Sequence, residues 1–340
     1  FGMVSLSPDT WTEGSWNSGY LYNSKEIRCF SHVHCWQLAG VPVMPTTGEV
    51  KGHKGMDAYK STYSHETEIV KPGYHKVELD TYQIRVELTS TSRVGMHRYT
   101  YPAGEKANVL FDVGALLAHG KTEKAAIHRI SSKEIGGYSV LAPTSRRKKP
   151  VTVYFVARFN QNMTAFGGWE KEGKEKKLVH KNSIEGADIG GYASFGKLKK
   201  QTLLMKVGIS YVSEEQARIN LEKELAHWNF DRVKEDAFAE WNRELGKITV
   251  EGGSEEEKIK FYTDLWHSLL GRHTFSDFNG KYILLDFWSS GCGPCIMALP
   301  EMKEIQEQYK ERLTIISLSS DTKSRWKAAS AKHEMTWQNL

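Results

Sequence analysis

The chain has 340 residues, of which 39% are hydrophobic and 26% charged, and it contains only 9 prolines. This composition provides enough apolar residues for one large domain or two, and it excludes a collagen-like or intrinsically disordered protein. The net charge of +5 is too small to indicate nucleic-acid binding. No run approaches the roughly 18 consecutive apolar residues of a membrane span, so we expect no membrane-spanning segment.

The N-terminal part of the chain has the sequence pattern of β-strands. Residues 81–101, 106–117, 150–159 and 202–212 are rich in β-branched and aromatic side chains, and glycine- and lysine-rich turns separate them. Because no helices alternate with these strands, we predict an antiparallel β-sandwich.

From Ser213 onward the pattern becomes helical. Ser213 is a predicted N-cap, and acidic residues occupy the turn that follows it. Residues 232–245 and 255–270 repeat apolar side chains at helical spacing. We therefore predict trailing amphipathic helices, with a turn at Gly252–Gly253 between the last two.

The pattern changes again at about Phe278. Residues 281–288 and 313–320 are nearly continuous apolar runs, typical of buried parallel strands, and a helix is predicted between them up to about Lys310. Residues 322–337 are also predicted to be helical. This order indicates the opening of an α/β domain.

Cys292 and Cys295 enclose Gly293–Pro294 at the junction of the predicted strand and helix. The backbone N–H groups and the dipole of a helix N-terminus favour the thiolate of Cys292. We therefore predict that Cys292 is the nucleophile and that Cys295, one turn later, attacks the mixed disulfide. The alternative is half of a zinc site, but a second pair of ligands at the required spacing is absent from the sequence, so we predict no bound metal.

The motif Cys292-Gly293-Pro294-Cys295, together with Leu285–Trp288 before it and Pro300 after it, resembles the thioredoxin fold. Residues 279–340 look most like the TlpA-like extracytoplasmic branch of that fold. The resemblance implies that Asp286 is the buried acid that moves a proton on and off Cys295. It also implies a disulfide-containing protein partner and no cofactor for the redox site.

The match departs from that family in two ways. Gly291 stands where thioredoxins usually have tryptophan before the first cysteine. The family's cis-proline loop and its last strands would lie beyond Leu340, so the resemblance implies a truncated thioredoxin-like domain.

Two histidines stand out near the N-terminus. His32 and His34 are two residues apart, so on a strand both would point to one face and could bind a metal or polarise a hydroxyl group. Because no third ligand is specified, core-packing and surface roles are the favoured interpretation of these histidines. Cys29 and Cys35 could form a disulfide in an oxidising compartment.

Residues 1–277 contain a series of short motifs in a fixed order: Gly2-Met3, Ser7-Pro8, Gly19-Tyr20, Phe30-Ser31-His32, Met44-Pro45, Pro72-Gly73-Tyr74, Glu87-Leu88-Thr89, Val207 to Ser210, Trp241-Asn242 and Phe261 to His267. In this order the motifs resemble family 92 of the glycoside hydrolases. The family comprises calcium-dependent, exo-acting α-mannosidases that invert the anomeric centre. Its members have an N-terminal β-sandwich, linking helices and an (α/α)6 barrel.

The resemblance implies three regions: a sandwich over 1–225, a helical linker over 226–277 that would lead into a missing barrel, and the truncated unit over 279–340. An inverting glycosidase needs two carboxyl groups, and by resemblance both belong to the barrel, as do most calcium ligands. Trp36 and His34 lie close to where the family places an aromatic side chain and a histidine beside the sugar. We predict that they bind a mannose-containing glycan, although packing of Trp36 in the core is an alternative.

We therefore predict a multidomain protein in which an antiparallel β-sandwich with trailing helices precedes a partial α/β thioredoxin-like unit. Its expected function combines a carbohydrate-associated domain with a thiol-disulfide oxidoreductase module. The alternatives are an α-1,2-type exo-mannosidase without its barrel and a non-catalytic carbohydrate-binding sandwich. Both families typically work outside the cytoplasm, so we expect a periplasmic, cell-surface or secreted protein.

Overall fold

The computed structural model describes residues 2–12, 19–35, 38–115, 117, 121–144, 148–173, 175–270, 276–277, 282–309 and 313–339. Contacts within the chain divide it into two compact units, Phe1–Phe275 and Ser276–Leu340. No helix in the described ranges is both long and apolar enough to cross a membrane.

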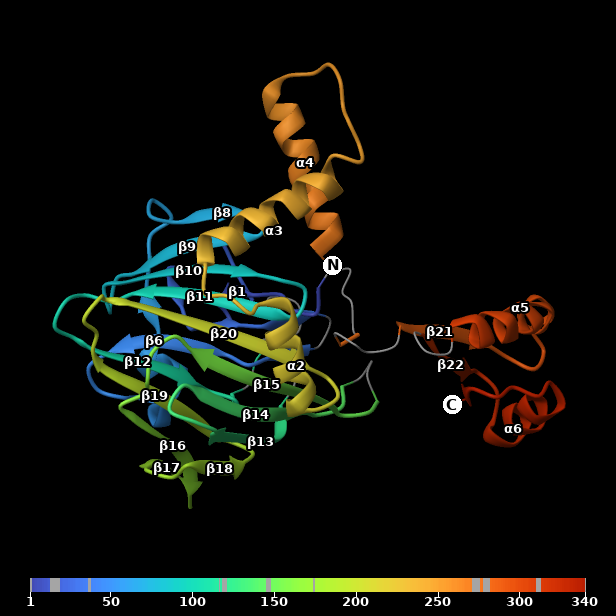
Figure 1. Cartoon of the computed structure of the whole chain (residues 1–340), viewed down its shortest axis with the longest axis horizontal. Coiled ribbons are helices and arrows are strands. Elements are labelled where there is room, and N and C mark those ends of the chain that lie inside the picture. Colours follow the sequence, from blue (N-terminus) through green and yellow to red (C-terminus); the bar gives the residue numbers. More distant parts are fainter. Residues whose placement is uncertain are drawn as a thin grey trace. The chain divides into compact units, whose positions relative to one another are not determined.

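Two antiparallel sheets form the N-terminal unit (Figure 1). The seven-stranded sheet contains, in spatial order, β1 (Ser7–Asp9), β3 (Cys29–Ser31), β6 (Val43–Thr47), β12 (Lys106–Phe111), β19 (Gly190–Lys197), β16 (Ala165–Glu172) and β17 (Glu175–Val179). The nine-stranded sheet contains β18 (Ser183–Gly186), β13 (Thr122–Arg129), β14 (Glu134–Leu141), β15 (Val151–Phe159), β20 (Thr202–Ser210), β11 (Val94–Thr100), β10 (Ile84–Ser90), β9 (Tyr74–Leu79) and β8 (Ile69–Lys71). The predicted antiparallel sandwich is confirmed.

Shorter elements complete the strand-rich part. Two small ladders pair β2 (Glu26–Ile27) with β7 (Ser61–Thr62) and β4 (Val33–Cys35) with β5 (Leu38–Gly40). A 3-10 turn, η1 (Gly52–Lys54), and a single helical turn, α1 (Met56–Tyr59), follow β6.

The main core consists of buried apolar side chains from both sheets. Phe111 of the seven-stranded sheet stacks on Phe155 of the nine-stranded sheet, with 6.0 Å between ring centroids. Trp169 is fully buried, and its ring lies where a Cβ atom on Gly52 or Gly190 would be. These two glycines therefore make room for the largest aromatic ring of the core.

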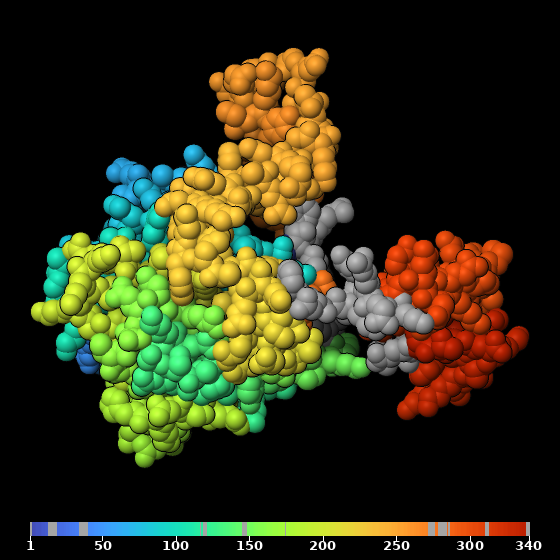
Figure 2. All heavy atoms as spheres, in the orientation of Figure 1, coloured from blue at the N-terminus to red at the C-terminus, as the bar shows by residue number. Residues whose placement is uncertain are grey.

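Helix α2 (Glu214–Glu224) covers the other face of the nine-stranded sheet, and Figure 2 shows its atoms, in yellow, directly against those of the strands. The Ser213 hydroxyl accepts a hydrogen bond from Gln216 N at 3.0 Å, as predicted for an N-cap. Ala217 and Leu221 belong to a second buried cluster with strand residues of β11 and β15. The helix therefore buries apolar residues that the sheet presents away from the main core.

Two further helices follow in the N-terminal unit. Asn229 caps α3 (Phe230–Leu245), because its side chain accepts a hydrogen bond from Arg232 N. The predicted turn at Gly252–Gly253, where both residues have positive φ, leads to α4 (Glu255–Leu270). The rings of Trp241 and Trp266 meet edge to face at 6.4 Å, which joins the two helices.

The C-terminal unit is a three-stranded parallel sheet of β21 (Tyr282–Trp288), β22 (Leu313–Ser319) and β23 (Gln338–Asn339), connected by α5 (Gly293–Tyr309) and α6 (Lys323–Lys332). Its core contains Leu299 and Met302 of α5, Ile315 of β22, and Trp337. The predicted α/β unit is confirmed.

The predicted helix over 322–337 is wrong at its C-terminal end. Helix α6 ends at Lys332, and Glu334 adopts a positive φ of 51°. The left-handed conformation at Glu334 turns the chain out of the helix, and Trp337 then enters the core beside β22.

Candidate active site

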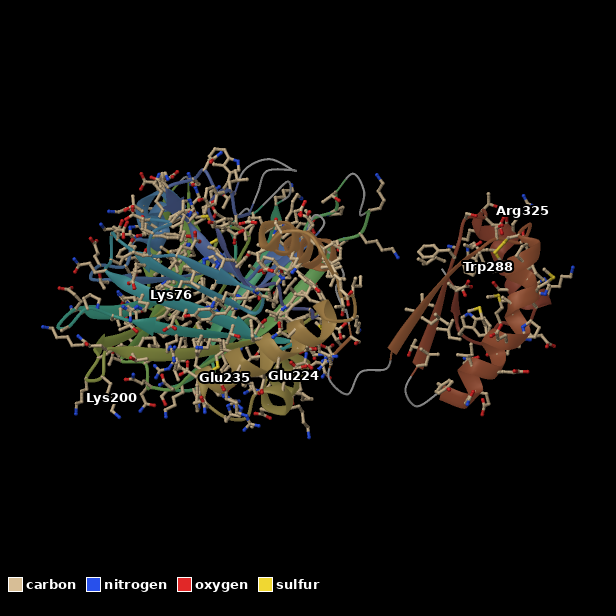
Figure 3. All side chains as sticks on the ribbon, turned by 90° about the horizontal axis from the view of Figure 1, so that it is seen from above. Lys76, Lys200, Glu224, Glu235, Trp288 and Arg325 are labelled. Atoms are coloured by element: carbon tan, nitrogen blue, oxygen red, sulfur yellow. A yellow bond between two sulfur atoms is a disulfide. The ribbon has the colours of Figure 1, made fainter. Side chains whose placement is uncertain are left out.

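A disulfide joins Cys292 and Cys295 at the junction of β21 and α5, with 5.3 Å between the Cα atoms. Figure 3 shows it as a yellow bond in the C-terminal unit. Cys292 immediately precedes the first residue of α5, and its sulfur accepts a hydrogen bond from Cys295 N at 3.3 Å. Both cysteines are half-buried. An N–H group of the first helical turn therefore points at the Cys292 sulfur.

The local sequence explains this position. Pro294 has no N–H group to lose and fits the first turn of a helix, where that group would have no intrahelical partner. Ile296 N donates to Cys292 O at 3.1 Å, which closes the first turn. Pro300 lies inside α5, where the resemblance to thioredoxins places a proline.

The loop before Cys292 is held by the segment that follows β22. Ser290 N donates to Asp321 Oδ2 at 2.6 Å, and Ser320 N donates to Trp288 O at 3.2 Å. The hydrogen bond from the Ser290 backbone holds the pKa of Asp321 below its ordinary value. These contacts join the two strand ends that flank the disulfide.

Asp286 lies on β21 beside Ser317 of β22 in the parallel register. Ser317 Oγ donates to Asp286 Oδ2 at 2.7 Å, and Trp337 Nε1 donates to Ser317 Oγ at 2.8 Å. Asp286 is half-buried, whereas Ser317 is fully buried. Ser317, Trp337 and Asp321 were not singled out from the sequence. A serine within the predicted buried strand 313–320 was the available signal for Ser317.

The predicted sugar-binding residues lie in and beside β4. His34 belongs to this strand by its backbone, but its side chain is outside the described part of the structure. Trp36 lies outside the described residues. Their roles stay predictions.

Both ring nitrogens of His32 form hydrogen bonds within the protein, so neither is available to a metal ion. Its Nδ1 lies 2.7 Å from Val41 O, and its Nε2 lies 2.8 Å from His97 Nε2. Tyr99 OH lies 2.8 Å from the other nitrogen of His97. Both nitrogens of His32 are thus in use, and the interpretation of His32 and His34 as a metal-binding pair is wrong for His32.

This network has one consistent assignment of hydrogens. A carbonyl can only accept, so the Nδ1–H group of neutral His32 donates to Val41 O. Nε2 of His32 then accepts from His97, whose Nδ1 accepts from Tyr99. Val41 has a φ of 51°, a strained conformation for a β-branched residue. Its carbonyl is held by His32, which is buried.

Cys29 is a free, buried thiol rather than half of a disulfide with Cys35. Its sulfur lies 3.7 Å from Asp9 Oδ2 on the paired strand β1. Burial and the neighbouring carboxylates raise its pKa well above the ordinary value, so Cys29 is unsuited to thiolate chemistry.

Among the described residues there is no cluster of three or more His, Cys, Asp or Glu side chains that could hold a metal ion. Calcium prefers six to eight oxygen ligands.

Comparison with known proteins identifies both parts. Residues 1–210 match the model of the glycosyl hydrolase family 92 N-terminal domain, which is more than half of the chain. The chain belongs to glycoside hydrolase family 92. Residues 216–295 match the catalytic-domain model of the same family, and residues 266–340 match the AhpC/TSA family. The chain is therefore a fusion of family 92 sequence with a thioredoxin-like segment, as predicted.

Two solved structures and one curated protein resemble the family 92 part. A family GH92 α-mannosidase from Bacteroides thetaiotaomicron is 29% identical, with a TM-score of 0.71, over 82% of this chain and 39% of that one. An inverting family GH92 mannosidase of the same organism, 24% identical with a TM-score of 0.69 over 82% of this chain and 36% of that one, shows the same fold. An uncharacterized secreted glycosidase of Arthroderma benhamiae is 22% identical over 82% of this chain and 39% of its own length. The chain thus spans about two fifths of these relatives.

The redox segment has relatives of its own. The thiol-disulfide oxidoreductase ResA of Bacillus thuringiensis is 44% identical over 46 residues, 13% of this chain and 27% of that protein. A thioredoxin of Synechocystis is 41% identical over 39 residues, 12% of this chain and 36% of that protein.

Proposed function

We propose that the C-terminal unit exchanges its Cys292–Cys295 disulfide with a disulfide-containing protein partner. The observation that carries the proposal is the position of the two cysteines: Cys292 at the start of α5 with an N–H group directed at its sulfur, and Cys295 covalently joined to it. The relatives that match this segment are a thioredoxin and a thiol-disulfide oxidoreductase, which supports the same reaction class.

In the reducing direction the unit starts as a dithiol. The Cys292 thiolate attacks one sulfur of the partner disulfide, so a mixed disulfide forms and one partner thiolate leaves. Cys295 then loses its proton and attacks the Cys292 sulfur, which restores the intramolecular disulfide and releases the second partner thiolate. The partner gains two electrons from the dithiol, and an external dithiol must reduce the unit again.

Asp286 is proposed as the group that takes the proton of Cys295. A carboxylate can accept this proton when the Cys295 thiol becomes a nucleophile. The Asp286 side chain is held in place by a hydrogen bond from Ser317. No cofactor is required for this reaction, because the electrons pass between sulfur atoms.

The proposal is tested by alkylation of the reduced full chain with iodoacetamide between pH 4 and 10. We expect the rate at Cys292, followed by peptide mass spectrometry, to be half-maximal below the unperturbed thiol pKa of about 8.5, because the helix N-terminus stabilises the thiolate. In denaturant the midpoint should return to about 8.5. The same midpoint in folded and denatured protein would contradict the proposed activation of Cys292.

We further propose that the family 92 part associates with mannose-containing glycans through the β4–β5 region, with Trp36 and His34 at the sugar. Its similarity to an α-mannosidase at 29% identity favours this ligand class. Binding is proposed without hydrolysis, because the two carboxyl groups that inversion needs and most calcium ligands belong, by resemblance, to the barrel. An intact α-1,2-type exo-mannosidase that contains this sequence is the alternative.

Mannose-containing glycans are expected to quench the tryptophan emission of the wild-type chain, and Trp36→Ala should lose most of that response. Trp326→Phe, in helix α6 of the other unit, is the matched control. An unchanged titration in Trp36→Ala would remove Trp36 from the binding site. Release of mannose in the presence of calcium would show hydrolysis and contradict the binding-only proposal.

An extracytoplasmic location agrees with both activities. The Arthroderma relative is named as secreted, and disulfide exchange of this kind is common in oxidising compartments. We propose that the chain works outside the cytoplasm.

A further inference from the structure

A short series of hydrogen bonds runs from the segment before β23 through β22 to β21, the strand that precedes Cys292. Trp337, which precedes β23, donates from Nε1 to Ser317 Oγ at 2.8 Å. Ser317 on β22 donates to Asp286 Oδ2 on β21 at 2.7 Å. Because Asp286 and Ser317 are register partners on parallel strands, their side chains leave the same face of the sheet.

The direction of both hydrogen bonds follows from the chemistry of the groups. An indole N–H can only donate, so it occupies a lone pair of Ser317. The single hydroxyl hydrogen of Ser317 is then free to point at Asp286. In this arrangement Oδ2 of Asp286 accepts the hydrogen bond from Ser317, and Oδ1 is the carboxylate oxygen that does not receive it.

Burial makes this arrangement hard to replace. Ser317 is fully buried and Trp337 is 8% exposed. Water cannot readily substitute for a deleted hydroxyl group there, so its removal would leave both Asp286 Oδ2 and the Trp337 indole without this partner.

Resting on the proposed redox function, we propose that Ser317 and Trp337 are positioning residues for disulfide exchange. They keep Asp286 Oδ2 as a fixed acceptor, so Oδ1 receives the proton that Cys295 releases when it attacks the mixed disulfide. Among the described residues, the titratable or charged groups at this end of the sheet also include Cys292 and Cys295 at the start of α5, Asp321 after β22, and Arg325 of α6, whose charge acts on Asp321.

The test measures insulin-disulfide reduction by the full chain, with dithiothreitol as reductant, between pH 5 and 9. In Ser317→Ala we expect release of the mixed disulfide to slow about tenfold near neutral pH, because Asp286 loses the group that fixes its Oδ2. Trp337→Phe keeps the ring in the core but removes the N–H donor, and it should slow the same step by a smaller factor.

Ser317→Thr retains the hydroxyl group and should restore the wild-type rate of release, while formation of the mixed disulfide by Cys292 stays unchanged in all these variants. A purely structural role of Ser317 would not predict this difference between the two steps. Ser330→Ala on α6 is the matched control, because the Ser330 hydroxyl has no hydrogen-bond partner among the described residues. If the wild-type chain is active and both Ser317→Ala and Trp337→Phe release the mixed disulfide at the wild-type rate, the inference is overturned while the proposed function stands. A wild-type chain that reduces no insulin at any pH would overturn the proposed function, and the inference with it.

Discussion

Cys292→Ser is expected to abolish insulin-disulfide reduction by the full chain, whereas Cys295→Ser should accumulate a mixed disulfide with the partner. A serine hydroxyl cannot form a disulfide, so the first variant cannot make the intermediate at all. The second variant makes the intermediate but lacks the thiol that resolves it. Turbidity of reduced insulin measures the first effect, and non-reducing electrophoresis with mass spectrometry detects the trapped species.

Cys29→Ser is the control for these variants. Its thiol is free but buried beside Asp9, in the N-terminal unit, so we expect full reductase activity in this protein. Activity that survives in Cys292→Ser, or a mixed disulfide that forms through Cys295 instead, would reverse the assigned roles.

Protonation of the buried histidine pair is expected by itself to lower the free energy of unfolding of the N-terminal unit by about 3 kcal/mol between pH 6.5 and 4. Burial lowers the pKa of His32 from 6.5 to about 4, and it lowers that of His97 well below its ordinary value. In this interval the unfolded chain binds protons that the folded chain does not bind, so stability falls as the pH falls. Urea unfolding followed by near-ultraviolet circular dichroism at several pH values measures the effect.

Asp112 makes the opposite contribution to the pH dependence of stability, because burial raises its pKa to about 6. As the pH falls toward 4, the folded chain binds a proton at Asp112 that the unfolded chain does not yet bind, so this group stabilises the fold. A paired comparison separates the two contributions. His97→Gln keeps an amide that can donate to His32 but cannot titrate, so its stability should depend less steeply on pH than that of the wild type. His227→Gln, a half-exposed position just after α2, should leave the slope unchanged. Equal slopes in His97→Gln and wild type would show that the histidine pair does not carry the effect.

Much of the architecture could be predicted because it depends on local patterns. The N-cap at Ser213 and the turn at Gly252–Gly253 are set by residues within one turn of each other, and the structure has both. The Cys292-Gly293-Pro294-Cys295 motif likewise needs only a strand, a proline-compatible helix start and a three-residue spacing to bring its sulfurs together. The helix predicted from the local pattern was wrong at residues 333–337, because the left-handed conformation of Glu334 ends the helix before them.

The strand order could not be read from the same patterns. Strand β12 lies between β6 and β19, and β11 lies between β10 and β20, although 85 or more residues separate some of these partners in sequence. Alternation of side chains shows that a segment is a strand and which of its residues are buried, but it does not name the neighbour with which the strand pairs.

The sequence by itself determined the sandwich class, the position of the redox motif and the family of each part, because these depend on periodicity, spacing and short ordered motifs. The tertiary structure alone decided which polar groups meet. It pairs His32 with His97, leaves Cys29 as a free thiol, and connects Asp286 through Ser317 to Trp337. The three hydrogen bonds, His32–His97, Asp286–Ser317 and Ser317–Trp337, each join residues at least 20 positions apart. Such contacts form only in the packed fold, where buried polar groups need hydrogen-bond partners.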